Sequence, residues 1–259
     1  MSNIKPLLKS EHSDSKWRRY ANYLHAKSDA VAPITVQEMV KASKVMPLCF
    51  IRTGEEAFVP AVIQSLVGGT NLLVAPDGRW MAPYVPACYR SFPFALGISE
   101  TGERILCADF DSDLIGEEGD PLFEDGEPSK AVKEVFGFLH TVQDDREKAK
   151  RVSAVLNEHN LIAEWPLKIK TESGENEVKG IYRINEAALN ALSAVDLAEV
   201  RDAGGLPVAY CQLLSMQNLV LLEQLAKFHA QAQQVSKAPD VEALFGEADD
   251  TLKFNFDDI

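Results

Sequence analysis

The residues best suited to bind a ligand are a group of arginines and aromatic side chains in the first half of the chain. The members of this group are Arg79, Trp80, Tyr84, Tyr89 and Arg90. Arginine pairs with anionic groups and also stacks on aromatic rings, so the group suits a small anionic or aromatic ligand. The alternative, which the sequence favours, is that the rings pack in a hairpin and that Trp80 covers a sheet.

A second group has the carboxylates of a metal site. Asp109, Asp111 and Asp113 have the alternating spacing with which a calcium loop begins. Leu114 stands at the sixth position, where an EF-hand loop needs glycine, and Asp120 replaces the bidentate glutamate at the twelfth. We therefore expect an ordinary acidic loop, with the three alternating aspartates as weak candidates for Ca²⁺ or Mg²⁺. The sequence predicts no metal and no cofactor.

The remaining motifs name no reaction. The chain lacks a phosphate-binding glycine loop, a nucleophile elbow, a zinc-protease motif and a dinucleotide fingerprint. His12 with Asp14, and His140 with Asp144, have the spacing of metal-ligand pairs but have no further ligand nearby in the sequence. An interaction or accessory protein without catalytic activity is therefore the leading interpretation. An enzyme or enzyme accessory that binds a ligand near Arg79 and Trp80 is the alternative.

Acidity is concentrated in two segments. The 259-residue chain has 26 basic and 39 acidic residues, a net charge of −13. Residues 109–127 and 240–259 contain most of the excess acid, and the rest of the chain is nearly neutral. Nucleic acids and anionic lipids bind positive surfaces, so neither is an expected partner. Residues 16–20 interleave basic and aromatic side chains, and we expect them to pack on the protein or to meet an acidic partner.

The sequence also predicts a cytoplasmic protein without a membrane span. The N-terminal residues lack the apolar run of roughly 7–15 residues that a secretory signal needs. No stretch approaches the ~18 uninterrupted apolar residues of a spanning helix. The most apolar stretch, 206–228, contains polar residues throughout and is typical of a buried amphipathic helix. Four cysteines far apart in the chain, without a C-x-x-C motif, indicate reduced and buried thiols.

The first half of the chain is rich in expected strands. Apolar runs predict strands at residues 48–51, 58–63, 71–74, 94–98 and 104–108. Asp77-Gly78 predicts a hairpin turn, and Thr35 with Glu38 forms a capping box that starts a short helix. Residues 1–33 are polar and predict an extended or loosely packed arm with a short helical stretch near residues 17–26.

The second half is mainly helical. Ser129 is the expected start of a long amphipathic helix, and Asn185 and Ser193 start two shorter ones. Strands at 167–171 and 178–184 form one hairpin, and a last helix runs from Pro207 to about residue 234. The fold class is therefore α+β, with a curved antiparallel sheet in the first half and a helical second half containing one β-hairpin. The expected divisions are an arm (1–33), an α+β domain (34–236) and an acidic tail (237–259).

The acidic tail is too charged to fold alone, yet it contains apolar residues. They are the terminal Ile259 and two groups of three, Val241, Leu244 and Phe245, then Leu252, Phe254 and Phe256. The first group has the spacing of one helix face, and the second group has the spacing of a half-buried strand. A purely solvating tail needs no phenylalanine, so we expect the tail to dock on a protein partner or on the body of the protein.

Ten short motifs in this order resemble the SapC family. They lie at residues 47–51 (PLCFI), 58–61 (FVPA), 71–74 (NLLV), 77–80 (DGRW), 84–87 (YVPA), 89–94 (YRSFPF), 117–123 (EEGDPLF), 126–128 (GEP), 180–186 (GIYRINE) and 210–215 (YCQLLS). The resemblance covers about residues 34–225. It implies a protein linked to surface-layer or envelope processes and supplies no catalytic residues. Family members are also labelled peptide-transporter permeases, but a permease needs several spanning helices. The oligomeric state and the identity of any partner stay open.

Overall fold

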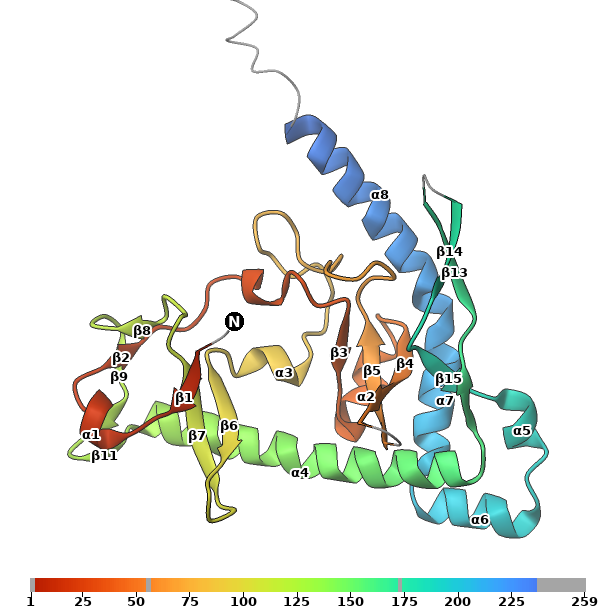
Figure 1. The fold of residues 1–259 in the computed structure, drawn as a ribbon, viewed down its shortest axis with the longest axis horizontal. Coiled ribbons are helices and arrows are strands. Elements are labelled where there is room, and N and C mark those ends of the chain that lie inside the picture. The colour runs from red at the N-terminus through yellow and green to blue at the C-terminus, as the bar shows by residue number, and fades with distance from the viewer. Residues whose placement is uncertain (1–2, 55–56, 172–173, 237–259) are drawn as a thin grey trace, which may run out of the picture.

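The computed structural model describes residues 3–54, 57–171 and 174–236. It combines helices with antiparallel sheets and confirms the α+β class. In Figure 1 the long helix α4 (Lys130–Glu158) lies along one edge of the molecule, and two groups of strands pack beside it. Helices α7 (Gly205–Ser215) and α8 (Leu219–Ser236) stand across its far end, and α8 extends away from the body.

The largest sheet has five antiparallel strands and combines both halves of the chain. In spatial order they are β12 (Ile162–Glu164), β15 (Tyr182–Ile184), β4 (Leu48–Thr53), β5 (Ala57–Ile63) and β3 (Val31–Pro33). The apolar runs of β4 and β5 are almost continuous, because side chains on both of their faces are buried. The expected strands at 48–51 and 58–63 are thus the centre of the fold.

The other sheets are smaller. A three-stranded sheet consists of β1 (Ile4–Pro6), β7 (Arg104–Asp109) and β6 (Phe94–Ile98), and a second consists of β8 (Ile115–Gly116), β2 (Lys16–Trp17) and β9 (Asp120–Pro121). Two hairpins complete the set: β10 (Phe123–Glu124) with β11 (Glu127–Pro128), and β13 (Leu167–Thr171) with β14 (Gly174–Val178). The acidic segment 109–127 therefore contributes several short paired strands.

The N-terminal residues differ from the expected loose arm. Their strands β1, β2 and β3 pair with β7, with β8 and β9, and with β5. The Trp17 side chain is only 3% exposed and packs edge-on against Phe94. The helical stretch expected near residues 17–26 is limited to the short 3₁₀ turn η1 (Leu24–Ala26). A short helix that the sequence did not predict, α1 (Lys9–His12), lies between β1 and β2. The pairings of β1 and β2 join residues about a hundred positions apart, and that of β3 joins residues about thirty apart, so local composition does not reveal them.

The helix starts follow the sequence closely. The Ser129 hydroxyl accepts a hydrogen bond from the Val132 amide at the start of α4, which is continuous to Glu158. Asn185 and Ser193 cap α5 (Glu186–Asn190) and α6 (Ala194–Asp202) in the same way. The expected last helix is instead divided into α7 and α8 by the 3₁₀ turn η2 (Met216–Asn218). Within this turn the side-chain amide of Asn218 donates hydrogen bonds to the backbone carbonyls of Ser43 and Met46. Both carbonyls follow the end of helix α2 (Val36–Ala42).

Two further expectations need correction. Residues 71–74 form no strand and contribute a single bridge, between Val74 and Trp80. The strand expected at 178–184 is split, since β14 ends at Val178 and β15 joins the central sheet. Proline-free apolar runs of four residues do not distinguish a strand from a buried loop.

Helix α7 fixes the central sheet through two buried polar residues. The Gln212 side chain accepts a hydrogen bond from the Ile184 amide at 2.9 Å and donates one to the Leu48 carbonyl at 3.1 Å. The Ser215 hydroxyl accepts one from the Leu48 amide at 2.9 Å. Strands β15 and β4 pair only between Tyr182 and Phe50, so these side chains supply partners that a longer ladder would provide.

Glu38, on α2, connects three segments. Glu38 is only 5% exposed. Its carboxylate accepts hydrogen bonds from the Thr35 backbone amide at 2.9 Å, the Tyr84 hydroxyl at 2.9 Å and the Ala87 backbone amide at 2.7 Å. The predicted capping box is therefore present, and the same carboxylate also holds the start of helix α3 (Ala87–Arg90).

We expect Glu38→Gln to lower the free energy of unfolding by about 1–3 kcal/mol, because the amide group of glutamine faces a donor where the carboxylate accepts. Urea denaturation followed by circular dichroism measures the change. Glu100→Gln is the control, since Glu100 is exposed in a turn, and it should change the free energy by less than about 0.5 kcal/mol. Equal stability of the two variants would contradict this role of Glu38.

Candidate functional site

The neighbouring side chains of Arg79 and Trp80 lie in different environments. Gly78 has a φ of +85° in the turn, and the exposed Arg79 guanidinium pairs with Asp77 at 2.7 Å. The Trp80 ring is half-buried between Tyr23 and Tyr89, and its Nε1 donates to the Tyr84 carbonyl at 2.8 Å. The Trp80 ring therefore packs against its aromatic neighbours, whereas the Arg79 side chain forms an ion pair at the turn.

The two tyrosines of the group are held from the interior. The Tyr84 hydroxyl donates to Glu38, and the Tyr89 hydroxyl accepts a hydrogen bond from Gln64 at 2.8 Å. Burial raises the pKa of Tyr89, and burial followed by the nearby Glu38 carboxylate raises the pKa of Tyr84. The Tyr84 phenol therefore anchors the loop before α3, and the Tyr89 phenol anchors α3 itself.

Arg90 is the member of the predicted group with the greatest capacity to bind a ligand. Its guanidinium lies over the Phe138 ring at 5.1 Å and over the Tyr84 ring at 6.0 Å from the centroids. Among the described residues it has no ion pair. Stacking fixes the guanidinium plane and leaves its N–H groups available.

We expect three phenols to ionise later in the folded protein than in the unfolded chain. Burial and a hydrogen bond with Tyr23 raise the pKa of Tyr20 to about 12, and the pKa values of Tyr84 and Tyr89 are also raised. A raised phenol pKa means that the fold favours the neutral form. This contribution to stability is fully present below pH about 10, the unfolded value, and falls as pH rises above it.

Absorbance at 295 nm during an alkaline titration measures the effect, with circular dichroism as the check that the protein is folded. The chain has six tyrosines, and the urea-denatured protein should ionise all of them near pH 10. A folded protein in which all tyrosines ionise together at that pH would contradict the burial of these phenols.

The structure places the three candidate metal aspartates of the acidic loop in two settings. One binds backbone amides, and the other two line a surface depression. The Asp109 carboxylate accepts hydrogen bonds from the backbone amides of Asn3 at 3.1 Å and Asp111 at 3.2 Å. It therefore fixes the N-terminal segment beside β7. Asp111 and Asp113 line an open depression beside Arg18 and Arg19.

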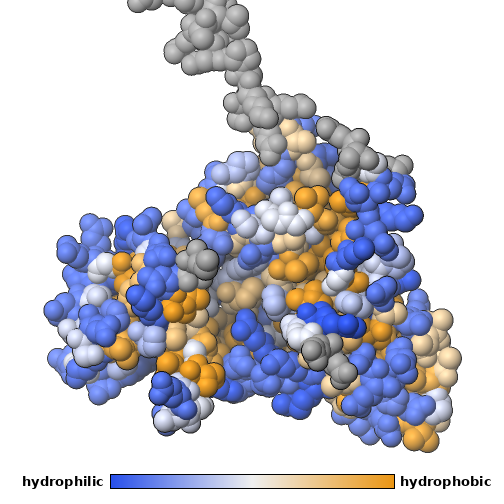
Figure 2. Space-filling view, in the orientation of Figure 1, coloured by the Kyte–Doolittle hydropathy of each residue, from blue (hydrophilic) through white to orange (hydrophobic). Residues whose placement is uncertain are grey.

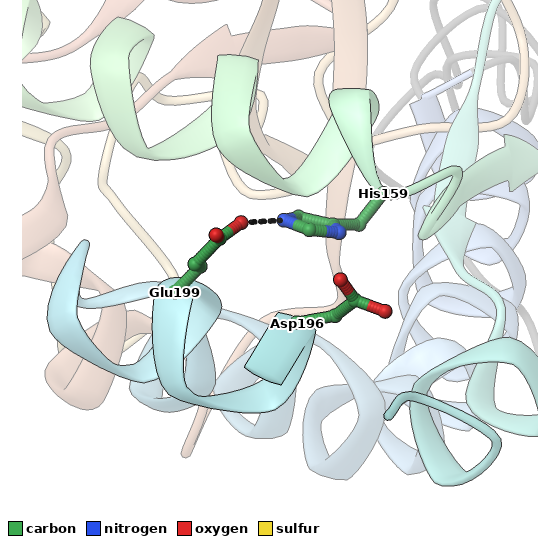
Figure 3. Close-up of side chains that lie close together, drawn as sticks. All are labelled: His159, Asp196 and Glu199. Atoms are coloured by element: carbon green, nitrogen blue, oxygen red, sulfur yellow. Dashed lines mark ion pairs between the residues drawn. The ribbon is translucent and has the colours of Figure 1, made fainter. Parts of the chain in front are cut away.

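A different cluster has the side chains of a metal site. His159, at the end of α4, lies beside Asp196 and Glu199 of α6, with one ligand atom of each within 4.8 Å of the others (Figure 3). His159 Nε2 pairs with Glu199 at 3.3 Å, and the Asp196 carboxylate accepts a hydrogen bond from Ser193 at 2.8 Å. These contacts explain the cluster without a metal ion, because they join the end of α4 to α6. Sequence reasoning missed it because His159 is distant from both acids in the chain.

Helices α7 and α8 carry large apolar side chains that are exposed. Tyr210 is 50% exposed, Leu214 68% and Phe228 43%. The positions in line with these three in the sequence, at alternate steps of three and four residues, are Pro207, Gln217, Leu221 and Gln224, of which Leu221 is partly buried against the core. In Figure 2 apolar side chains gather in the middle of this view, below the base of α8. We call these seven residues the α7–α8 face. The spacing is visible in the sequence, but it does not show which apolar residues of these helices are exposed.

The opposite side of the same helices is packed. Val208, Leu222 and Leu225 are buried, and His229 Nε2 lies 3.0 Å from the Leu72 carbonyl. The most apolar 18-residue window within Gly205–Ala232 has a mean hydropathy of 1.3, and 33% of that window is buried. By length and composition alone, this stretch is long and apolar enough to cross a membrane. Its buried Gln212 and Ser215 make the contacts of a helix packed against a sheet.

The cysteines are unpaired, and the tail residues fall outside the described chain. All four cysteines are free; burial raises the pKa of Cys49, and burial with the nearby Glu38 raises that of Cys88 to about 12. Thiols with raised pKa values are poor nucleophiles at neutral pH. Phe245, Leu252, Phe254 and Phe256 lie in 237–259, beyond the described residues.

These features define an α+β protein with an exposed apolar helix face and an arginine-bearing aromatic cluster. The family model SapC matches residues 7–222. The chain therefore belongs to the SapC family, and the match begins further towards the N-terminus than the motifs at 47–215 indicate. No curated protein and no solved structure matches the chain.

Proposed function

We propose that this SapC-family chain is a non-enzymatic accessory protein that binds a helix of a partner protein along the α7–α8 face. The observation that carries the proposal is the exposure of Tyr210, Leu214 and Phe228 on a helix pair whose other side is packed in the core. Apolar residues that gather on one exposed face are typical of interaction sites.

The spacing of the face indicates the kind of partner. On α7, steps of three and four residues place Pro207, Tyr210 and Leu214 along one line of the helix, and a second helix packs against such a line with its own apolar residues. No charged residue lies between Asp202 and Glu223. An uncharged, mainly apolar face matches an amphipathic helix better than a charged peptide.

The charge of the chain supports a protein partner over the other macromolecules. A net charge of −13 disfavours nucleic acid and anionic membranes. We place the protein in the cytoplasm, where its four free thiols stay reduced. A link to surface-layer or envelope processes is part of the proposal and derives from the family alone.

The alternative is an enzyme or enzyme accessory that binds a small anionic or aromatic ligand. One observation favours it: the unpaired guanidinium of Arg90 is stacked between Phe138 and Tyr84. No described arrangement of a nucleophile with a base accompanies it, so the partner-binding function has the stronger support.

Leu214→Ser should remove the partner and leave the protein folded, because Leu214 is exposed and its loss leaves no cavity. Affinity capture from the native host, quantified by mass spectrometry, compares this variant with the wild-type chain. Ile98→Ser is the matched control, since Ile98 is 66% exposed on β6, away from the α7–α8 face. Light scattering measures the oligomeric state of each protein.

Support requires a protein captured by the wild type and by Ile98→Ser but lost from Leu214→Ser. Equal capture by all three would contradict the proposal. A wild-type dimer that Leu214→Ser dissociates would assign the face to a second copy of the chain and would also contradict it.

The acidic tail has its own test. Truncation after Ser236 should change the melting temperature by no more than about 2 °C if the tail docks on a partner, since a loss of body contacts worth 1 kcal/mol shifts it by about 2–4 °C in a domain of this size. The same truncation should then reduce capture of that partner. Unchanged melting together with unchanged capture would contradict any docking of the tail.

A further inference from the structure

A cleft of about 420 Å³ lies beside Arg90. Its walls come from the N-terminal segment after β2, the end of α3 and the first turns of α4. The side chains that the argument uses are Arg19, Tyr20, Arg90, Phe92, Glu134 and Phe138. The volume falls in the range of small-molecule sites, which is roughly 300–1,000 Å³.

Two arginines in this cleft are held by aromatic rings rather than by acids. Arg90 stacks on Phe138, and the Arg19 guanidinium lies over the Trp17 ring at 5.9 Å from its centroid. Among the described residues neither has an ion pair. The neighbouring Arg18 differs, because it contacts Glu118 at 3.6 Å and the Asp113 carbonyl at 2.9 Å.

The two guanidinium groups lie close enough to one side chain of the cleft, Tyr20, to affect it electrostatically. Both Arg19 and Arg90 are close enough to Tyr20 to lower its phenol pKa, although burial raises that pKa more strongly. One acid, Glu134, lines the cleft against two arginines. The lining is therefore positive in a chain whose net charge is −13, and anions are favoured there.

The aromatic walls supply the other half of the chemistry. Tyr20, Phe92 and Phe138 are half-buried, and Trp17 is 3% exposed. The Trp17 Nε1 is buried, and no described residue accepts its hydrogen bond. A buried donor without an acceptor is costly, and an oxygen of a ligand relieves that cost where it reaches the donor.

We infer that this cleft binds a small organic anion that carries an aromatic ring. The acidic group, a carboxylate, phosphate or sulfonate, lies between Arg19 and Arg90, and the ring packs against Tyr20, Phe92 and Phe138. The site differs from the one that the sequence predicts, because Arg79 and Trp80 lie outside it and Arg19 belongs to it. It is also separate from the α7–α8 face.

A pair of fluorescent probes tests both halves of the inference. 1-Anilinonaphthalene-8-sulfonate has an aromatic body with an acidic group, and N-phenyl-1-naphthylamine has the same body without the charge. The purified full-length chain should bind the sulfonate at one saturable site. Arg90→Gln and Arg19→Gln should each weaken sulfonate binding about tenfold, the loss of one charge-assisted contact. The affinity for the neutral probe should change less than twofold.

Arg79→Gln is the matched control, because Arg79 is exposed and outside the cleft. Leu214→Ser is a second control that reports probe bound on the α7–α8 face. Both should bind the sulfonate as the wild type does, and all variants should melt at the wild-type temperature. Equal weakening by Arg79→Gln and Arg90→Gln, loss of the signal in Leu214→Ser, or equal binding of the two probes to every variant would overturn the inference.

Discussion

A buried carboxylate is stable only if hydrogen-bond donors surround it. In this fold, the donors come from several elements, and their hydrogen bonds to the carboxylate hold those elements together. Glu38 accepts hydrogen bonds from Thr35, Tyr84 and Ala87. Two of these donors belong to the loop and helix that carry Arg90. The buried Asp145 of α4 acts in a similar way, since it accepts a hydrogen bond from the Gln37 amide at 2.9 Å. Both carboxylates bind the first turn of α2, and thereby fix α3 and α4, the two helices that enclose the cleft.

The α7–α8 pair combines a structural side with a side that is free. Gln212 and Ser215 supply hydrogen bonds to β15 and β4, so the helix cannot leave the sheet without exposing their backbone groups. The opposite side carries Tyr210 and Leu214 into solvent. A rigid helix that presents apolar residues loses little conformational entropy when a second helix binds, which is why such a face suits recognition.

The elements that the sequence predicts well are those fixed by local chemistry. Ser129, Asn185 and Ser193 start helices because their side chains accept hydrogen bonds from the backbone amides three positions further on. The hairpin of β6 and β7 likewise needs only a turn of a few residues. The N-terminal strands could not be predicted, because Trp17 pairs with Ile115 and Asp120, about a hundred positions away.

The candidate site shows the same division. The sequence places Arg79, Trp80 and Arg90 close together, but the turn at Gly78 directs Arg79 to Asp77 and packs Trp80 against Tyr23. Arg19 and Arg90 share a cleft although 71 positions separate them, and only the paired N-terminal segment brings them together. Hydrophobic spacing gives the buried side of α7, whereas the exposed side is recognised only once the packing is known.

The central claim, a partner helix on the α7–α8 face, is tested most directly by photo-crosslinking in the native host. A photoreactive phenylalanine analogue replaces Leu214 in one chain and Ile98, equally exposed on β6, in another. The account predicts one discrete adduct from position 214, joined to an amphipathic helix of a different protein, and none from position 98. The same adducts from both positions, or an adduct at 214 to a second copy of this chain, would contradict it.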